Sequence, residues 1–324
     1  MGQQYARNWK ASFTVGGKAL DPSSLRMRFA TQQKDTSTPH VLNLFITNPS
    51  RTTIEAIREE YKKVEISAGY DQDIGTIFSG EIIQVRSGRE NVVDTYVHIL
   101  ATGSERPRNF AVVNKALAAG HTFRDRVDVA AKALQEYGVS VGHIDDLGNK
   151  KFPRNFICFG MAKDLLREVC EATGASWHIH NGKLNILKNQ NTLPDGAVVL
   201  NSDTGMVGLP EQTLQGVIVR CLLNYRIRPG TKLQINESSI QRAAISPAYA
   251  AGAQNTFFRD QSPNEALQSG ILGIAADGFY KALLVEHNGD TRGPNWYTEI
   301  VCVKADGGYS PALISRGISD AEGN

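Results

Sequence analysis

The chain has 324 residues, 41% of them hydrophobic, so it can bury one large core or two to three modest ones. Its 35 Lys and Arg and 33 Asp and Glu give a formal net charge of only +2, and neither sign forms a long block. This balance argues against a nucleic-acid binder driven by electrostatics and against a polybasic membrane anchor, although DNA could still pass nearby. The N-terminus lacks the apolar region of a signal peptide, and no run is long enough to span a bilayer, so we expect a soluble protein made in the cytoplasm.

The first third of the chain, residues 1–103, is predicted to be a β-rich domain with one helix. From Phe13 onward, LRMRFAT alternates apolar and polar residues, which predicts a half-buried strand with a cationic outer face, and VLNLFIT predicts a strand covered on both sides. Ser50 or Thr52 can cap a short helix through IEAIREEYKK. The segment from VEISAGY to ILATG then predicts three antiparallel strands, with turns around 71–75 and 87–91.

Residues 104–194 are predicted to form a small α/β middle domain with a weak helix-strand repeat. The helical pattern in FRDRVDVAAKALQEYG is followed by VSVGHI, and the one in MAKDLLREVCEATG by ASWHIHNGKLNIL. Each helix ends near a glycine, Gly138 and Gly174, as C-terminal caps prefer. Asn181-Gly182 separates WHIH from KLNIL, which predicts a β-hairpin with a primed two-residue turn.

Residues 195–324 are predicted to form a second β domain. Strand character returns in AVVLN, QGVIVRCLL, TKLQIN, FYKALLVEHN and WYTEIVCV, with turns at Pro229-Gly230 and at 288–294. A long excursion at about 236–276 interrupts this domain, and residues 315–324 are predicted to be a mobile tail. The fold class expected from the whole pattern is α+β, predominantly β, in the order β, α/β, β.

The residues that could carry chemistry do not form a catalytic or metal-binding pattern. The four cysteines, Cys158, Cys170, Cys221 and Cys302, are widely spaced in apolar segments, which favours buried reduced thiols. His178 and His180 share one strand face but have no third ligand at supporting spacing, which favours a polar sheet face over a metal site. Glu59-Glu60 lies among charged neighbours, and the common hydrolase, zincin and phosphate-loop motifs are absent. We therefore predict no catalytic residue, no metal and no cofactor.

The loop HNGDTRGPNW, residues 287–296, concentrates turn-forming and charged residues between two strands. Asp290 and Arg292 could pair across a tight turn, with glycines at positive φ and Trp296 packing below. A rigid loop of this kind could also present a docking surface, so a structural and a functional role both stay open.

Three stretches together resemble the baseplate and tail hub proteins of contractile-tailed phages, a tail-tube-like, late control D-like family. They are VEISAGYDQDIGTIFSGEIIQVRSG, SDTGMVGLPEQTLQGVIVRCLLNYRIRPGTKLQI and DGFYKALLVEHNGDTRGPNWYTEIVCV, the last with a GDTRG-x-x-W-x-T core. They occur in the family's order and span about Phe13 to Val303. The residues that the resemblance marks as structural or assembly positions are Gly69, Tyr70, Gly80, Gly205, Pro210, Gly216, Asp290, Arg292, Gly293 and Trp296.

The resemblance implies two tail-tube-like β domains flanking the middle domain, and a homotrimeric ring that matches a threefold spike to a sixfold tail tube. Its implied partners are the central spike, the tail tube or tube initiator, the tape-measure protein and baseplate wedge proteins, with DNA passing through the lumen without specific binding. The implied location is the virion baseplate, assembled in the host cytoplasm, with no stable membrane insertion.

Three alternatives stay open at the level of sequence. The chain could be the hub of a tailocin or of a type VI secretion-like device, which nothing in the residues separates from a phage hub. It could be a peptidoglycan hydrolase of the tail tip, although no acid and nucleophile arrangement is recognisable. It could also be a receptor- or glycan-binding module, which the aromatic residues Tyr249, Phe257 and Phe258 suggest.

Overall fold

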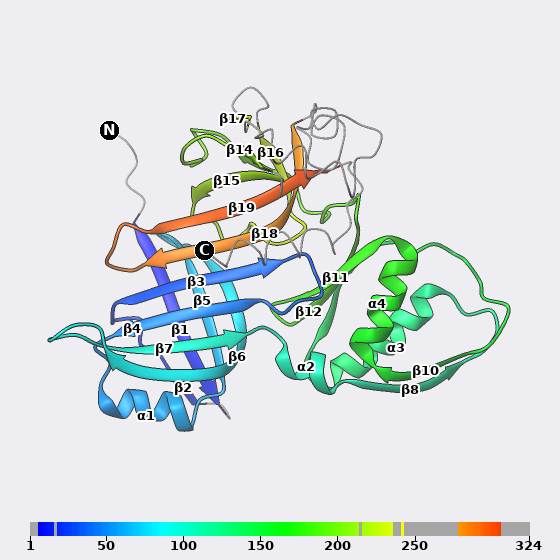
Figure 1. Ribbon diagram of the computed structural model, residues 1–324, viewed down its shortest axis with the longest axis horizontal. Coiled ribbons are helices and arrows are strands. Elements are labelled where there is room, and N and C mark those ends of the chain that lie inside the picture. The colour runs from blue at the N-terminus through cyan, green and yellow to red at the C-terminus, as the bar shows by residue number, and fades with distance from the viewer. Residues whose placement is uncertain (1–5, 16–17, 214–215, 236–240, 243–277, 306–324) are drawn as a thin grey trace, which may run out of the picture. The chain divides into compact units, whose positions relative to one another are not determined.

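The computed structural model describes residues 6–15, 18–213, 216–235, 241–242 and 278–305 (Figure 1). Strands dominate these residues and most strand pairs of the large sheet are antiparallel, which confirms the predominantly β, α+β class. The chain divides into two compact units. Unit 1 holds residues 1–188, 223–226 and 286–297, and unit 2 holds residues 189–222, 227–285 and 298–324. The boundaries drawn from the sequence at 103/104 and 194/195 stay a prediction.

The first part of unit 1 is an antiparallel sheet with the strand order β3-β4-β7-β6-β5-β1-β2. Its strands are β1 (Arg7–Val15), β2 (Lys18–Leu20), β3 (Met27–Lys34), β4 (Val41–Thr47), β5 (Lys63–Tyr70), β6 (Asp73–Arg89) and β7 (Thr95–Thr102). The three strands expected between residues 64 and 103 are therefore confirmed as β5, β6 and β7. The first strand begins at Arg7, earlier than the expected Phe13, because β1 pairs along its whole length with β5.

Side-chain alternation explains the core of this sheet. In β3, Met27 and Phe29 point into the core while the residues between them are more exposed, as the sequence pattern predicts. In β4 only Leu42, Leu44 and Ile46 are fully buried, so the expectation of a strand covered on both sides was wrong for the chain by itself. Its other face is half-buried in the part of the chain that the structure describes.

Helix α1 (Arg51–Glu59) interrupts the strands where the sequence places it. Ser50 is the N-cap, and its hydroxyl accepts a hydrogen bond from the backbone N–H of Thr53. Ile57 is the buried residue of this helix and joins the core of the sheet, so one apolar anchor holds an otherwise charged helix.

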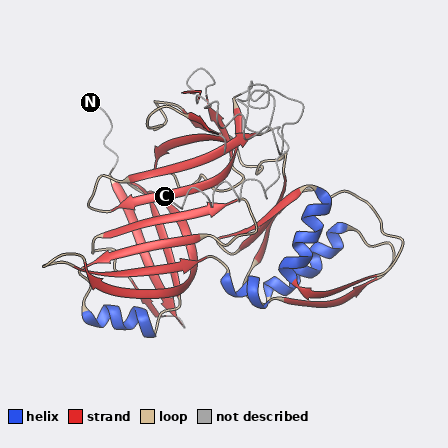
Figure 2. Cartoon of the chain, viewed as in Figure 1, coloured by secondary structure: helices blue, strands red, loops and turns tan. Residues whose placement is uncertain are grey.

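The helices α2 (Glu105–Phe110), α3 (Phe123–Gln135) and α4 (Ala162–Thr173) gather in the middle part of the chain (Figure 2). They pack with β8 (Val112–Leu117), β9 (Ser140–Ile144), β10 (Phe156–Met161), β11 (Ala175–His180) and β12 (Lys183–Lys188). The repeat of α3 then β9 and α4 then β11 is confirmed. Strands β8 and β10, which form a separate two-stranded sheet, were not predicted.

Local signals set the ends of these elements. Thr122 and Asp125 form a reciprocal capping box at the start of α3, and Gly174 closes α4 in the left-handed conformation. Asn181 and Gly182 both have positive φ, at 47° and 75°, which confirms the primed two-residue turn between β11 and β12. A separate hydrophobic core, which includes Val127, Leu166 and Ile186, holds this α/β part together.

Unit 2 is a second β-rich unit with its own core around Val219, Leu233 and Tyr280. Its strands are β13 (Val198–Leu200), β14 (Glu211–Thr213), β15 (Gly216–Leu222), β16 (Lys232–Ile235), β17 (Gln241–Arg242), and the unit 2 portions of β18 (Phe279–Asp290) and β19 (Trp296–Lys304). The expected long excursion at 236–276 and the expected tail at 315–324 lie outside the described residues, apart from β17.

All four cysteines are free and buried, as predicted. Cys158 and Cys170 belong to the middle core, and Cys221 and Cys302 to the core of unit 2. Burial raises the pKa of Cys170 and of Cys221 to about 12, which keeps both thiols protonated and unreactive at neutral pH. Within the part of the chain that the structure describes, no helix is long and apolar enough to cross a membrane.

Candidate assembly site

The residues of the GDTRG-x-x-W stretch form the tip of the β18–β19 hairpin, residues 286–297, which we call the tip. The whole tip belongs to unit 1 and lies beside β3. Inside the turn, the N–H of Asp290 donates to the carbonyl of Asn295 at 2.7 Å, and the N–H of Arg292 donates to the Asp290 carboxylate at 3.0 Å. Gly293 leaves room for that carboxylate, because a Cβ atom at this position would displace the Asp290 side chain. The turn is therefore closed around Asp290.

An ion pair joins Asp290 of the tip to Arg26, the residue before β3. The guanidinium donates in a bidentate manner, from Nε to Oδ1 at 3.1 Å and from Nη2 to Oδ2 at 2.6 Å. The hydrogen bond from Arg26 is the main reason that the pKa of Asp290 lies below its usual range. The sequence suggested Arg292 as the partner, but the Arg292 guanidinium turns away and donates to the carbonyl of Ser24 at 3.3 Å.

Backbone groups of the tip are also bound by residues from the start of the chain. Arg7 donates to the carbonyls of Gly293 and Pro294, the latter at 3.0 Å. Thr291 and Met27 exchange two hydrogen bonds, from the Thr291 N–H to the Met27 carbonyl at 2.9 Å and from the Met27 N–H to the Thr291 hydroxyl at 3.0 Å. These hydrogen bonds hold the tip against the start of β3 and against the N-terminal strand β1.

Trp296 anchors the tip in the hydrophobic core of unit 1, as the sequence predicts. Its side chain is buried, and its ring meets Phe29 and Trp9 edge to face at centroid distances of 5.4 and 6.0 Å. The Arg7 guanidinium lies over the ring, 5.7 Å from the centroid. Aromatic packing below and charged hydrogen bonds above therefore fix the same turn.

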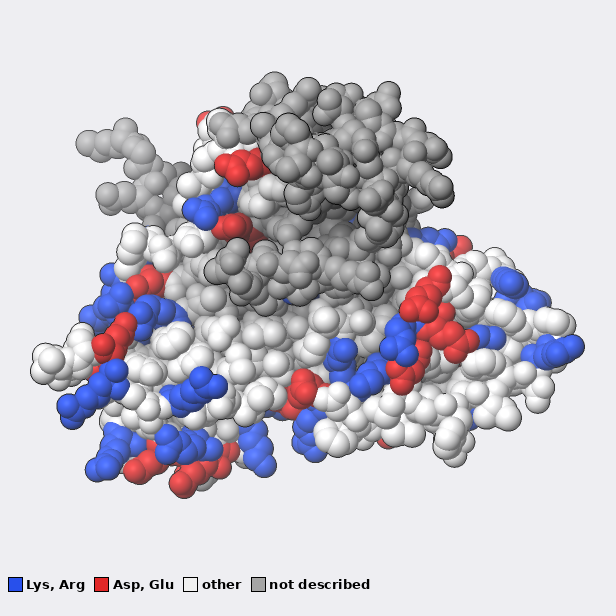
Figure 3. All heavy atoms as spheres, viewed as in Figure 1, with Lys and Arg blue, Asp and Glu red and all other residues white. Residues whose placement is uncertain are grey.

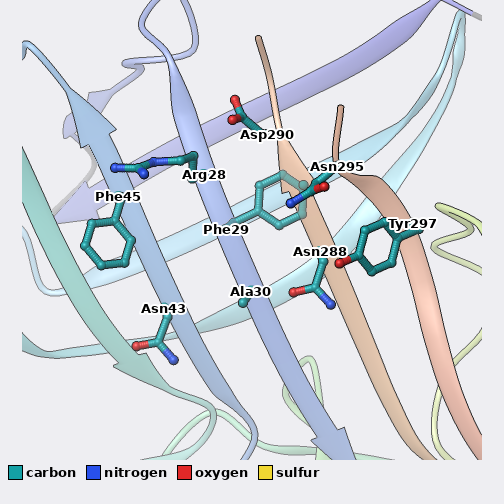
Figure 4. A pocket seen from close by; sticks show the side chains of 10 residues that line it. Arg28, Phe29, Ala30, Asn43, Phe45, Asn288, Asp290, Asn295 and Tyr297 are labelled. Atoms are coloured by element: carbon teal, nitrogen blue, oxygen red, sulfur yellow. The ribbon is translucent and has the colours of Figure 1, made fainter. Parts of the chain in front are cut away.

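A shallow pocket of about 260 Å³ lies between β4, β3 and the tip, and the tip supplies five of its lining residues (Figure 4). Figure 4 shows the Phe45 ring on one side and Tyr297 on the other. Ten residues line the pocket, namely Arg28, Phe29, Ala30, Asn43, Phe45, Asn288, Gly289, Asp290, Asn295 and Tyr297. Its amides and rings can hydrogen-bond and stack, but the lining contains no nucleophile paired with a base.

The other positions singled out in the sequence fall into two groups. Gly69 and Tyr70 end β5 opposite Asn8 and Arg7, so they lie at the same corner of unit 1 as the tip, and the Tyr70 hydroxyl reaches the Trp296 carbonyl at 3.5 Å. The remaining glycines and proline lie elsewhere. Gly80 packs against the Thr102 carbonyl and the Phe78 ring in β6, whereas Gly205, Pro210 and Gly216 belong to unit 2.

The two histidines of WHIH lie on one polar face of β11, as the sequence favoured, and this face is buried. Every residue of β11 is buried, and the rings of His178 and His180 lie 6.2 and 5.5 Å from that of His40. His178 Nδ1 lies 2.9 Å from the Asp35 carboxylate. Burial, and secondarily His178, lowers the pKa of His40 to about 3, so His40 is neutral at pH 7. The two histidines belong to a buried polar cluster.

This buried cluster does not have the order of a catalytic triad. Ser176 also donates to Asp35, at 2.9 Å, so the carboxylate lies between the serine and the histidine rather than behind the histidine. Across the described ranges, no group of three or more His, Cys, Asp or Glu side chains could hold a metal ion.

The fold defined above is that of phage tail proteins and related injection devices. The 43 kDa tail protein of prophage MuSo2 from Shewanella oneidensis is similar, with a TM-score of 0.52, 10% identity and coverage of 92% of this chain and 99% of that one. A tail protein from Neisseria meningitidis has a TM-score of 0.55 at 10% identity, with coverage of 93% and 99%. The Escherichia coli type VI secretion component c3393 has a TM-score of 0.52 at 11% identity, with coverage of 89% and 76%.

The sequence itself matches the family model described as baseplate hub gp41 over residues 42–245, which is more than half of the chain. The chain belongs to this family of phage baseplate hub proteins. A search of the curated proteins finds no match.

Sequence reasoning missed two residues that hold the tip, Arg7 and Arg26. Arg26 carried a signal, because it belongs to the cationic face predicted for LRMRFAT. Arg7 carried none, since a single arginine before the first predicted strand does not indicate a partner 286 residues away.

Proposed function

We propose that the chain is a structural hub that forms a homotrimeric ring between the sixfold tail tube and the threefold central spike. Membership of the baseplate hub family is the observation that carries this proposal. Each chain would contribute two tube-like β domains, so three chains would present six similar lobes to the tube and three to the spike. Closing the ring would also cover strand edges that the single chain leaves open.

The tip supports a role in this assembly because its shape is fixed before any partner binds. Asp290 and Trp296 hold the turn from opposite sides, so docking would not have to order it. The residues singled out as an assembly motif would act by positioning this turn and the neighbouring strands. The pocket that the tip forms with β3 and β4 would receive a side chain of a partner or of a second copy.

The partners proposed for the ring are the spike, the tail tube or tube initiator, the tape-measure protein and the baseplate wedge proteins. The tape measure and later DNA would pass through the lumen without specific binding. A net charge of +2 over 324 residues favours a lumen through which DNA passes without being held. A channel that bound DNA would need dense positive charge. Assembly would take place in the host cytoplasm, and the protein would have no enzymatic activity.

Electron imaging of the purified chain at high concentration tests the ring. The expected result is a threefold ring with six similar lobes and an axial channel. Imaging is repeated after mixing with the candidate spike protein, since assembly can require the spike. Monomers in both preparations would contradict the proposal.

A hub of a type VI secretion-like device is the second candidate, because the E. coli component c3393 shares the fold. The two candidates differ in cargo. Particles that contain the chain are purified and assayed for nuclease-protected DNA, which a phage virion carries and a secretion device or tailocin lacks. DNA-free contractile particles from an induced culture would favour the second candidate.

A further inference from the structure

Strand β11 places its side chains in two different environments. Those of Trp177 and Ile179 join the hydrophobic core of the α/β part, whereas those of His178 and His180 point the opposite way. The two histidines are buried as well, because the turn between β3 and β4, residues 35–40, packs against them. The cores of the first sheet and of the α/β part are separate hydrophobic clusters. A polar contact therefore joins this turn to β11.

The polar contact consists of one carboxylate, one hydroxyl and three imidazoles. The Asp35 carboxylate lies 2.9 Å from His178 Nδ1 and accepts a hydrogen bond from Ser176 at the same distance. The ring of His40 lies 6.2 Å from that of His178 and 5.5 Å from that of His180. All five residues are buried, and the most exposed of them, His180, is only 9% exposed.

The charges of this cluster cannot balance in acid. The Asp35 carboxylate can compensate one imidazolium, whereas three imidazoles can take up protons. The groups around them add no negative charge: Lys34 presents its backbone carbonyl to His40, and the pKa of Cys170, raised to about 12 by burial and then by Asp35, keeps that thiol neutral. Lys183, which pairs with His180 in the register of β11 and β12, is exposed and positive. Full protonation would therefore leave excess positive charge in a buried site.

Exposed charges behave differently from this cluster. On the face of the molecule shown in Figure 3, Lys and Arg side chains are interspersed with Asp and Glu, and water screens their interactions. Burial removes that screening from the cluster, and it is the main reason that the pKa of His40 falls from 6.5 to about 3. Protons therefore bind more readily once the turn has moved away from β11 and water has entered.

We propose that the cluster is an acid-sensitive latch, which holds residues 35–40 against β11 at neutral pH and releases them reversibly on acidification. Above the ordinary histidine pKa of 6.5, His40 is neutral in the closed and in the open state, so the latch keeps its full stability. Between that value and the closed-state pKa of about 3, the open state binds more protons, so the stability of the closed state falls with the pH. At about pH 4.5, His40 alone would raise the ratio of open to closed latch by up to about 100-fold.

Hydrogen exchange of the full chain, read by mass spectrometry at about pH 7.5 and about pH 4.5, tests the latch. Each exchange rate is divided by the intrinsic rate at the same pH. The reporters are the backbone amides within residues 35–40 and that of Gly103, which donates to the His40 carbonyl at 2.8 Å. Their protection is expected to fall by up to about 100-fold in acid and to return on neutralisation, while helix α4 stays protected. Unchanged protection of the reporters, or an equal loss in α4, would overturn the proposal.

Two substitutions are expected to move the acid response in opposite directions. His40→Gln removes a buried imidazole, so the loss of protection between the two pH values should be at least about tenfold smaller than in the unchanged chain. Asp35→Asn removes the carboxylate that compensates positive charge, so release should begin at a higher pH. A merely structural role would change protection at both pH values alike.

The matched control is His143→Gln, which changes a histidine of β9 whose side chain is 32% exposed and should leave the acid response as it is in the unchanged chain. Circular dichroism at neutral pH checks that each variant is folded, and the exchange of the unchanged chain decides the proposal if one is not. An acid response of His40→Gln equal to that of the unchanged chain, or a shift of both cluster variants in the same direction, would contradict the latch.

Discussion

Two hairpin turns of unit 1 reach a defined shape in opposite ways. In the β11–β12 hairpin the turn consists of Asn181 and Gly182, whose own preference for positive φ closes it. In the β18–β19 hairpin the turn depends on Arg26 and Arg7, which are 264 and 286 residues away in the sequence. The first turn is therefore a local property of the chain, whereas the second exists only when both ends of the chain have come together.

This difference has a consequence for stability within one unit. The local turn can form as soon as its two strands meet, while the tip must first bring distant residues together. The contacts that hold the tip should accordingly open independently of the β11–β12 hairpin. The following changes test that separation, beginning with the largest expected effect.

Trp296→Ala should have the largest effect, because it removes a buried ring that contacts Phe29 and Trp9. Loss of a buried aromatic side chain costs about 3–5 kcal/mol. Limited proteolysis should then cut within residues 289–295 much faster than in the unchanged chain, while residues 178–186 stay protected. Equal loss of protection in both hairpins would show that the two are not separate.

The Arg26–Asp290 pair should contribute less, because the Arg26 side chain is 42% exposed although that of Asp290 is only 10% exposed. Arg26→Ala is expected to lower the free energy of unfolding by about 1–2 kcal/mol, since solvent screens the exposed partner but the carboxylate is left buried. A double-mutant cycle combines Arg26→Ala with Asp290→Asn. The free energy of unfolding of each variant, measured by chemical denaturation, gives the coupling energy of the Arg26–Asp290 pair. The exposed pair Arg124 and Asp128 is the control, with an expected coupling of about 0.3–0.5 kcal/mol.

The pH dependence of the same pair has a definite sign. Folding lowers the pKa of Asp290, mainly through the hydrogen bond from Arg26, so the pair stabilises the protein above the usual carboxyl pKa of about 4. That stabilisation is lost as the pH falls through the lower folded-state pKa. The stability difference between the unchanged chain and Arg26→Ala should therefore shrink on acidification. A difference that grows as the pH falls would contradict this account of the pair.

Gly182→Ala should destabilise the protein no more than Arg26→Ala does, and clearly less than Trp296→Ala. A side chain at its φ of 75° costs about 1–2 kcal/mol, because non-glycine residues rarely adopt the left-handed conformation. The tip should keep its protection in this variant. Gly196→Ala is the control, since Gly196 has open space around its Cβ position and no positive φ. Thermal unfolding of this variant should show the same stability as that of the unchanged chain.

Much of the fold could be read from short-range patterns. Alternation located β3, the Ser50 cap located α1, and helical periodicity located α3 and α4. Strands β8 and β10 escaped prediction, since β8 exposes Val112 and Lys115 and carries no clean alternation. Such a pattern does not distinguish a sheet with an exposed apolar face from a loop.

The candidate site was predicted in its residues but not in its contacts. The sequence indicated that Asp290 and Trp296 matter to a tight turn, because charged, glycine and aromatic residues were concentrated between two strands. It suggested Arg292 as the partner of Asp290 because that arginine is close in sequence. The structure supplies Arg26 instead, since the residue directly before β3 places its guanidinium on the carboxylate with bidentate geometry.

The sequence by itself determined the β-rich character of this protein, its helix caps and the Asn181-Gly182 turn, because each depends on residues within a few positions of one another. Only the tertiary structure decided which arginines hold the tip and that His178 lies buried against Asp35. The physical reason is that burial and ion pairing depend on which distant segments pack together, and hydrophobic periodicity constrains that choice without specifying it.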